Sequence, residues 1–251
     1  MKISFVIPAF NEAARIEGCV RSVAKEVARA EAADEVAPGQ CEIIVVNNAS
    51  SDNTAQLALA AGARVVSETC KGLVWARAAG QRAAMGELVA NIDADVLLPE
   101  GWLSYVVHSF DTNPNLVALS GPFIYYDLSA FKRAMVKVFY FFGLLLAQLY
   151  RLFKVGAMLQ GGNFCVRREA LERAGGYDTS IDFYGEDTDI AKRMSKVGRV
   201  KWTFKLPVYA SGRRIAKEGI IRTSFLYSIN FFWVTFFGKP FSKRYKDIRP
   251  E

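Results

Sequence analysis

Histidine is almost absent from this chain, since His108 is the only one among 251 residues. A histidine-rich zinc site is therefore excluded, and a Ser-His-Asp triad would have to use His108 itself. The four cysteines are scattered without a C-x-x-C pair, so a disulfide framework is also excluded; they are Cys19, Cys41, Cys70 and Cys165. Any bound metal must be held mainly by oxygen, which makes carboxylates the residues to follow.

Two common phosphate-binding motifs are missing as well. No G-x-G-x-x-G follows the first predicted strand, and G-x-x-x-x-G-K-[ST] occurs nowhere in the chain. A nicotinamide-binding Rossmann site and a P-loop are both unsupported. A nucleotide-binding site in this protein must be of another type.

The chain has no very long apolar run. The two most apolar stretches, 138–150 and 225–237, hold 13 uncharged residues each, whereas a bilayer span takes roughly 20. We interpret both as segments that lie in the membrane interface, with buried core helices of a soluble protein as the alternative. Two apolar surface runs would also suit a homodimer.

Acidic residues are scarce near the C-terminus. Residues 192–251 contain 15 Lys and Arg against 3 Asp and Glu, a net charge of +12, and residues 1–191 carry the balancing −5 of the total +7. A basic, aromatic segment of this kind favours an anionic membrane surface. The N-terminus shows no signal peptide, so we expect a cytoplasmic protein with reduced thiols, peripheral on the inner face of the cell membrane.

Residues 1–95 alternate between strand and helix signals. Apolar runs at 4–7, 41–46, 64–67 and 88–92 predict strands, and helical spacing predicts helices over 16–27, 54–61 and 74–85. Pro99 opens a further helix. This alternation predicts an α/β fold with a doubly wound, mostly parallel sheet and flanking helices.

Polar side chains follow several of these strands, where ligands bind in such sheets. Asp93 and Asp95 come directly after the strand 88–92. Two carboxylates at that place suit a hard divalent cation shared with a diphosphate, although an Asp-x-Asp in a solvated turn is the simpler alternative. Glu186 and Asp187 open a later helix, where the local dipole favours an ionised base; helix capping is the alternative there.

Six short motifs, taken in order, resemble the family 2 glycosyltransferases with the GT-A fold. They are Pro8-Ala-Phe-Asn-Glu12, Asn47-Asn-Ala-Ser-Ser-Asp52 with Thr54, Lys71-Gly72, Asp93-Ala-Asp95, Gly161-Gly-Asn163 and Glu186-Asp187. Each motif is modest, but their order and spacing are jointly specific. The resemblance implies an inverting enzyme that uses a nucleotide diphosphate sugar, either a UDP-sugar or a GDP-sugar.

The resemblance also implies roles for individual residues. Asp187, beside Glu186, would be the catalytic base, and Asp95, supported by Asp93, would bind Mg²⁺ or Mn²⁺. Gly162 and Asn163 would border the sugar and acceptor pocket. Arg213 and Arg214 would steady the diphosphate. The nucleotide sugar would contact Pro8, Ala9, Asn11, Glu12, Asn48, Lys71, Arg77 and Asp93.

The resemblance covers about residues 1–214, where we expect the catalytic domain. Its nucleotide-binding half would be 1–95, and its acceptor half, 96–214, would carry an apolar insertion at 130–156. Residues 215–251 would form a basic, aromatic tail of interfacial amphipathic helices. The acceptor would be a hydroxyl or a phosphate, such as a polyprenyl phosphate or a lipid-linked saccharide in cell-envelope glycan synthesis.

One departure from the family concerns the second strand. The family most often has Asp-Asp-Gly-Ser there, and this chain has Asn47-Asn48-Ala49-Ser50. An Asn carbonyl still accepts a hydrogen bond from a base, but the base preference is open. The Gln-x-x-Arg-Trp motif of processive members is absent, which favours a single addition.

Three other functions compete with this hypothesis. A nucleotide-sugar-binding scaffold without turnover is kept open by the two asparagines. A sugar-nucleotide pyrophosphorylase would need a Gly- and Arg-rich loop in place of residues 9–12. Nucleic-acid binding is not expected, because the tail aromatics lie in long apolar stretches rather than between Lys and Arg.

Overall fold

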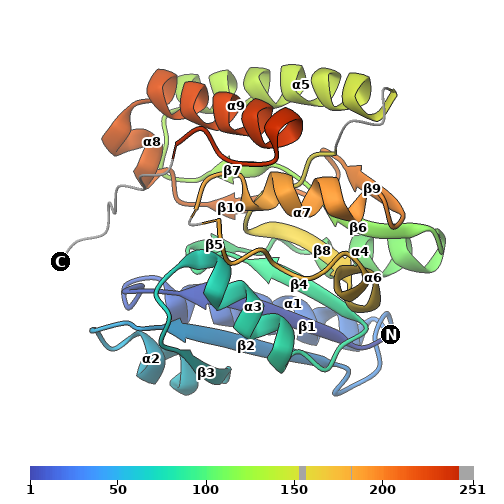
Figure 1. Ribbon diagram of the computed structural model, residues 1–251. Helices are drawn as coiled ribbons and strands as arrows, with labels where there is room; N and C mark the ends of the chain where they lie inside the picture. Colours follow the sequence, from blue (N-terminus) through green and yellow to red (C-terminus); the bar gives the residue numbers. More distant parts are fainter. Residues whose placement is uncertain (153–156, 182, 243–251) are drawn as a thin grey trace.

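The computed structural model describes residues 1–152, 157–181 and 183–242 and contains a main sheet of seven strands (Figure 1). Their order across the sheet is β3-β2-β1-β4-β8-β6-β9. The strands are β1 (Ile3–Ala9), β2 (Cys41–Asn48), β3 (Arg64–Glu68), β4 (Leu88–Ile92), β6 (Leu116–Ser120), β8 (Asn163–Arg167) and β9 (Arg199–Trp202). Only β8 runs antiparallel to its neighbours in this sheet, so the predicted mostly parallel sheet is confirmed.

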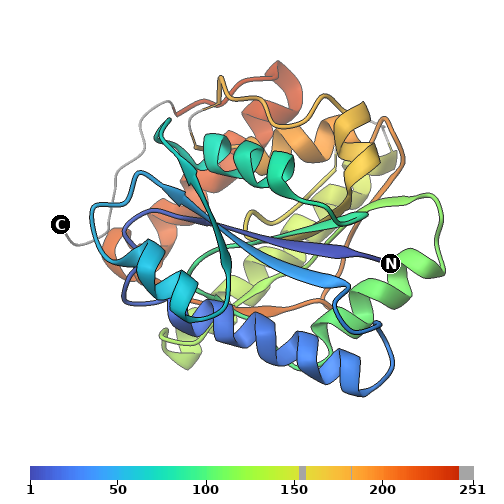
Figure 2. The ribbon, with the colours of Figure 1, turned by 90° about the horizontal axis from the view of Figure 1, so that it is seen from below.

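Helices cover both faces of this sheet (Figure 2). One face packs against α1 (Ile16–Ala32), α2 (Thr54–Ala60) and α4 (Trp102–Asp111), and the other against α3 (Leu73–Ala83), α6 (Arg168–Arg173) and α7 (Glu186–Met194). Side chains alternate between the two cores along each strand. In β1, for example, Phe5 and Ile7 lie in the first core, and Val6 lies in the second.

The described residues also form a second sheet of three strands and three further helices. This sheet is formed by β5 (Val96–Leu97), β10 (Val208–Ala210) and β7 (Phe123–Tyr125). Three further helices follow, namely α5 (Ala130–Leu152), α8 (Arg213–Glu218) and α9 (Ile220–Phe237). In Figure 1, α5 and α9 form the top layer of the molecule, at the end opposite α2 and β3.

The helix α9 has an unusual distribution of side chains. Its buried residues are mostly polar, with Thr223, Asn230 and Thr235 beside Val234. Several of its aromatic residues are exposed, and Phe225 and Phe237 are each more than half exposed. The predicted tail thus contains an apolar helix that buries mainly polar side chains and leaves several aromatic side chains exposed.

Two features of the structure bear on the predicted tail. The 13-residue run 225–237 belongs to an 18-residue helix that is long and apolar enough to cross a membrane by length and composition alone. The expected boundary at 214 falls inside α8, and α9 packs on α7, where Lys192 Nζ donates a hydrogen bond to the Thr235 carbonyl at 2.7 Å. Residues 243–251 and 153–156 of the predicted tail and insertion lie outside the described residues.

We expect Gly80→Ala to lower the free energy of unfolding by about 1–3 kcal/mol, because α3 packs directly on β1 there. A Cβ at residue 80 would lie 2.2 Å from Val6 Cγ1. The matched control is Gly18→Ala in α1, where the nearest heavy atom would be 3.8 Å away and alanine should add about 0.5–1 kcal/mol. Urea unfolding of both variants measures this, and equal stabilities would contradict the close packing of α3.

Candidate active site

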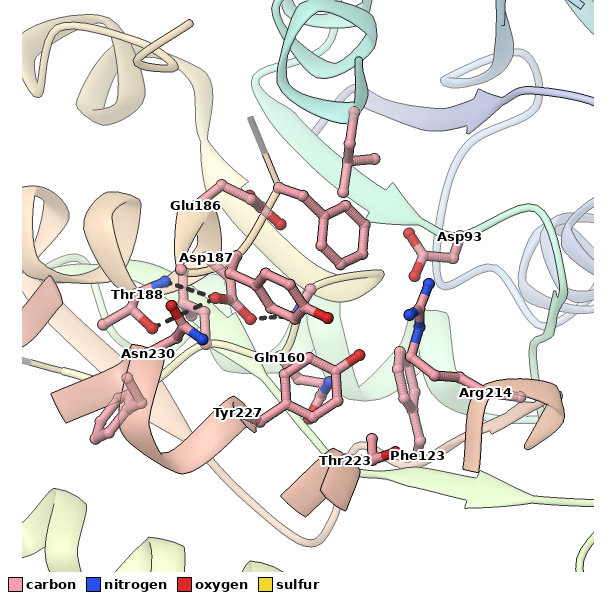
Figure 3. A pocket seen from close by; sticks show the side chains of 18 of the residues that line it. Asp93, Phe123, Gln160, Glu186, Asp187, Thr188, Arg214, Thr223, Tyr227 and Asn230 are labelled. Atoms are coloured by element: carbon pink, nitrogen blue, oxygen red, sulfur yellow. Dashed lines mark hydrogen bonds between the residues drawn. The ribbon is translucent and has the colours of Figure 1, made fainter. Parts of the chain in front are cut away.

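One cavity of about 1180 Å³ lies between the main sheet and the helices α5 and α9. Most of the predicted site residues line it: Pro8, Ala9, Glu12, Asn48, Lys71, Arg77, Asp93, Asp95, Glu186, Asp187, Arg213 and Arg214. Figure 3 shows Asp93, Glu186 and Asp187 in this cavity together with Tyr227 and Asn230 of α9, and Asn230 lies beside Asp187 and Thr188. The structure therefore brings together side chains separated by up to about 200 positions in the sequence.

The strand register explains this convergence. In the parallel pairing of β1 and β2, Ala9 lies opposite Asn47, and β4 runs parallel to β1 on its other side. The carboxyl ends of all three strands thus reach the same edge of the sheet. Asp93 and Asp95 follow β4 at that edge.

An acidic cluster lies at this edge around Arg213. The Arg213 guanidinium donates a hydrogen bond from Nη1 to Glu12 Oε2 at 2.9 Å, and its Nη2 lies 3.1 Å from Asp95 Oδ2. Burial, together with the nearby carboxylates of Asp93 and Glu12, raises the pKa of Asp95 to about 7, although Arg213 acts in the opposite direction. A further cation at this edge would favour the ionised form of Asp95.

Arg77 is a buried cation between two parts of the site. Its side chain is fully buried, its Nη2 lies 3.3 Å from Asp93 Oδ1, and its Nη1 is in contact with Glu186. Burial raises the pKa of Glu186, and the neighbouring guanidinium opposes that rise. In this structure Arg77 joins the carboxylate after β4 to the start of α7.

Asp187 stands in the first turn of α7, after Gly185 in the left-handed conformation. Its Oδ2 accepts a hydrogen bond from the Gly161 N–H at 3.0 Å, and its Oδ1 accepts one from the Thr188 N–H at 2.8 Å (Figure 3). Burial raises the pKa of Asp187, and these two donors stabilise its ionised form. Oδ1 also accepts a hydrogen bond from Thr188 Oγ1 at 3.4 Å, whereas Oδ2, with one donor, keeps a second lone pair with which to accept a proton.

Gly162 and Asn163, which we predicted to border the sugar and acceptor pocket, are packed against other parts of the chain. Gly162 has φ +80°, and a Cβ there would lie 2.1 Å from Asp93 Cγ, so the backbone packs directly against this carboxylate. Asn163 is fully buried, accepts a hydrogen bond from Trp102 Nε1 at 3.1 Å and donates one to the Leu206 carbonyl at 2.8 Å. Neither residue is among those that line the cavity, whereas Gln160 and Gly161 are.

Asn11 also lies outside the cavity lining. Its Oδ1 accepts a hydrogen bond from the Ser51 N–H at 2.9 Å, and its own N–H donates to Ser50 Oγ at 3.1 Å. It joins the loop after β1 to the loop after β2. Lys71 does line the cavity, with its Nζ 3.9 Å from the centre of the Phe10 ring.

Asn48 uses its whole amide group on the chain itself. Its Nδ2 donates hydrogen bonds to the carbonyls of Glu68 at 3.2 Å and Cys70 at 2.8 Å, and its Oδ1 accepts one from the Gly72 N–H at 2.7 Å. An aspartate could not donate to those carbonyls. The asparagine that departs from the family motif thus holds the segment 68–72 against β2.

Several cavity residues were not predicted from the sequence. Thr188 caps the Asp187 carboxylate, and Tyr140 of α5 donates a hydrogen bond to Gln160 Oε1 at 2.9 Å. Asn230 of α9 also lines the cavity. Tyr140 and Asn230 lie within aromatic runs whose sequence pattern gives no sign of which residue faces inward.

Comparison with known proteins identifies the family. Residues 4–175 match the family described as Glycosyl transferase family 2. The chain belongs to glycosyl transferase family 2. The match includes the strand-end residues and Asp93-Ala-Asp95, and it ends before Glu186.

One curated relative of this family 2 chain is the glucosyl-dolichyl phosphate glucuronosyltransferase of Haloferax volcanii. The two sequences are 23% identical over 189 residues, which cover 71% of this chain and 56% of the relative. The chain thus spans little more than half the length of that relative.

Solved structures share the fold. A mannosyltransferase of Pyrobaculum calidifontis, in complex with GDP-mannose and Mn²⁺, superposes with a TM-score of 0.63 at 22% identity, over 84% of this chain and 56% of that one. Glucosyl-3-phosphoglycerate synthase of Mycobacterium tuberculosis, in complex with Mn²⁺, UDP-glucose and phosphoglyceric acid, superposes with a TM-score of 0.64 at 23% identity. The superposition covers 93% of this chain and 79% of that one. The predicted GT-A fold is confirmed.

We expect Asn48→Asp to lower the free energy of unfolding by about 1–3 kcal/mol, because it places a carboxylate against two carbonyl oxygens. The loss should shrink at low pH, where a protonated carboxyl donates one hydrogen bond. The measurement is urea unfolding at pH 7 and pH 4.

Asn47→Asp is the matched control for this prediction. Asn47 Oδ1 accepts a hydrogen bond from the Ser50 N–H at 3.3 Å, which a carboxylate accepts equally well. If both variants were as stable as the parent chain, Asn48 would not hold the segment 68–72.

Proposed function

We propose that this protein transfers one sugar from a UDP-sugar or GDP-sugar, with inversion, to a hydroxyl of a lipid-linked saccharide at the cytoplasmic membrane surface. The observation that carries the proposal is that one cavity contains paired carboxylates at one end, Asp187 beyond them, and the aromatic helices α5 and α9 at the other. Family membership and the nucleotide sugars bound by the two solved relatives support the donor part.

The donor end fits Mg²⁺ or Mn²⁺ shared with a diphosphate. Asp95 and Asp93 are the ligands we propose; in the structure they pair with Arg213 and Arg77, and no group of three or more His, Cys, Asp or Glu side chains converges among the described residues. These cations often keep few protein ligands and complete their coordination with phosphate and water. When bound, such an ion would neutralise negative charge on the departing nucleotide.

The guanidinium groups of Arg213 and Arg214 lie at the same end of the cavity. Figure 3 shows Arg214 reaching from α8 into the cavity on the side of Asp93. Guanidinium groups bind phosphate oxygens well, so both residues suit the diphosphate of the donor.

Asp187 favours a hydroxyl acceptor over a phosphate. A phosphate monoester loses its second proton at a pKa of about 6 and attacks as an anion without help. A hydroxyl must lose its proton as the new bond forms, and a carboxylate with a raised pKa is suited to accept it. The name of the Haloferax volcanii relative, which includes glucosyl-dolichyl phosphate, supports a lipid-linked saccharide.

The apolar end of the cavity suits the lipid part of this acceptor. It is lined by Phe139, Phe142 and Leu145 of α5 and by Tyr227 and Phe232 of α9. Outside the cavity, both helices expose further aromatic residues, and the stretches 130–152 and 219–242 contain no Asp or Glu. Exposed basic residues flank this surface, namely Arg133, Lys137, Arg222 and Lys239, which complement an anionic bilayer.

We expect Asp187→Asn to lower the transfer rate by about 10²–10⁴, because the acceptor proton loses its base. Transfer of radiolabelled sugar from UDP- and GDP-sugars to lipid extract measures the rate. Binding of the nucleotide should survive, so UDP or GDP with Mn²⁺ should still raise the melting temperature of this variant by roughly 5–10 °C at about 100 times the dissociation constant.

The matched variant Asp95→Asn should lose nucleotide binding instead. The metal-dependent rise in its melting temperature with UDP or GDP should disappear, since we propose that Asp95 holds the ion. Normal thermal shifts without transfer in the parent chain would instead support a binding scaffold, and full activity of Asp187→Asn would contradict its role as a base.

We expect the full chain to bind vesicles with anionic lipids, and Phe225→Glu with Phe236→Glu to weaken that binding by on the order of tenfold or more. Both side chains are about half exposed or more on α9. The control is Leu59→Glu, an equally exposed apolar residue on α2, at the other end of the molecule (Figure 1). Vesicle co-sedimentation measures the binding.

A chain that stays in solution with anionic vesicles would contradict the membrane part of the proposal. If light scattering then showed a dimer that the same glutamates dissociate, the aromatic surface would belong to a second copy of the chain.

A further inference from the structure

A short series of hydrogen bonds connects α5 to Asp187. The Tyr140 hydroxyl donates to Gln160 Oε1 at 2.9 Å, and the next residue, Gly161, donates its N–H to Asp187 Oδ2 at 3.0 Å. The peptide bond between Gln160 and Gly161 therefore carries the donor that faces the carboxylate. Figure 3 shows Gln160 beside Asp187 in the cavity.

This peptide bond is held from several sides. The Gln160 N–H donates to Ser120 Oγ at 2.9 Å, and the Gln160 carbonyl accepts a hydrogen bond from the Asn163 N–H at 3.0 Å. The side chain of Gln160 is held by Tyr140. Tyr140 of α5 thus holds the side chain of the same residue whose backbone amide and carbonyl are held by Ser120 and Asn163.

Tyr140 is itself firmly placed. It is buried, its ring lies 5.7 Å from the ring of Trp202, and its hydroxyl accepts a hydrogen bond from the Phe123 N–H at 3.3 Å. Burial raises the pKa of Tyr140, so the hydroxyl stays protonated and remains the donor toward Gln160.

Gly161 also lies close to the charged groups around Asp187. A Cβ at this position would lie 3.2 Å from Glu186 Oε1, 3.4 Å from Asp187 Oδ2 and 3.5 Å from Arg77 Nη2. A small rotation of the 160–161 peptide therefore changes the surroundings of Asp187.

We propose that Tyr140 is a positioning residue, which orients the Gly161 N–H through Gln160 and thereby sets the geometry of Asp187. The inference rests on the proposed function, in which Asp187 is the base. It adds that α5 bears directly on the catalytic step, because a shift of α5 that breaks the bond from Tyr140 to Gln160 would move Asp187 out of its position and leave less of it ionised at low pH.

The test is Tyr140→Phe, which removes one hydroxyl and keeps the ring beside Trp202. We expect kcat to fall by on the order of tenfold, with the KM for the nucleotide sugar unchanged, because the donor carboxylates are not touched. The Gly161 N–H stabilises ionised Asp187. Weakening that bond raises the pKa of Asp187, so the acidic limb of the kcat profile should move upward by about half a pH unit.

Two further variants separate positioning from simple packing. Gln160→Leu should cause a similar loss, and the double variant should be no worse than Gln160→Leu alone, because both changes break one connection. Tyr126→Phe removes the hydroxyl of an exposed tyrosine nearby and should leave kcat and the pH profile unchanged.

Carboxyl ¹³C NMR of Asp187 gives a readout that needs no substrate. An upward shift of its titration in Tyr140→Phe would support the proposal even if the chain transferred no sugar, in which case only the proposed function would fail. An unchanged titration, or an effect confined to the KM of the acceptor, would overturn the proposal.

Discussion

The site depends on one buried cation. Arg77 has no exposed side-chain surface, and its guanidinium contacts Asp93 on one side and Glu186 on the other. Glu186 is buried and Asp93 is partly exposed, and the buried Glu186 carboxylate would be strongly destabilising without this cation. Because α3 carries Arg77 while β4 and α7 carry the carboxylates, the same ion pair fixes the donor end of the cavity relative to the start of α7. The close packing of α3 on β1 at Gly80 keeps the guanidinium in place.

The fold was accessible from the sequence because its signals are local. Apolar strands buried on both faces and helices at regular spacing predicted the parallel sheet, and the strand-end motifs predicted which edge would bear the site. Twelve site residues named from the resemblance do line one cavity. Asn11, Gly162 and Asn163 do not. A polar side chain or a glycine next to a site can make hydrogen bonds or a tight turn within the chain as readily as it can contact a ligand, and the sequence does not distinguish the two.

What the sequence could not indicate is which side of an apolar helix faces inward. In α9 most of the polar side chains that are buried satisfy their hydrogen bonds within the helix, as Thr235 Oγ1 does with the Phe231 carbonyl at 2.7 Å and Thr223 Oγ1 does with the Gly219 carbonyl at 2.8 Å. Such residues can lie against protein without a partner from another element. Aromatic residues such as Phe225 and Phe236 are then left exposed, an arrangement that is unfavourable in water and favourable at a bilayer surface. Periodicity alone describes this helix only as apolar.

The two ends of the cavity impose different requirements, and Asp187 lies where they meet. A sugar nucleotide is polar and arrives from water, whereas a lipid-linked acceptor arrives from the membrane and must bring one hydroxyl to the base. An enzyme of this kind would lose less donor to hydrolysis if its base were correctly oriented only while the membrane-side helix is in place. The base would then not activate water in place of the acceptor. The connection from Tyr140 to Gly161 has the required form, since it begins on the helix that would meet the lipid and ends on the carboxylate that would accept the proton. The geometry of the base would then depend on the position of α5.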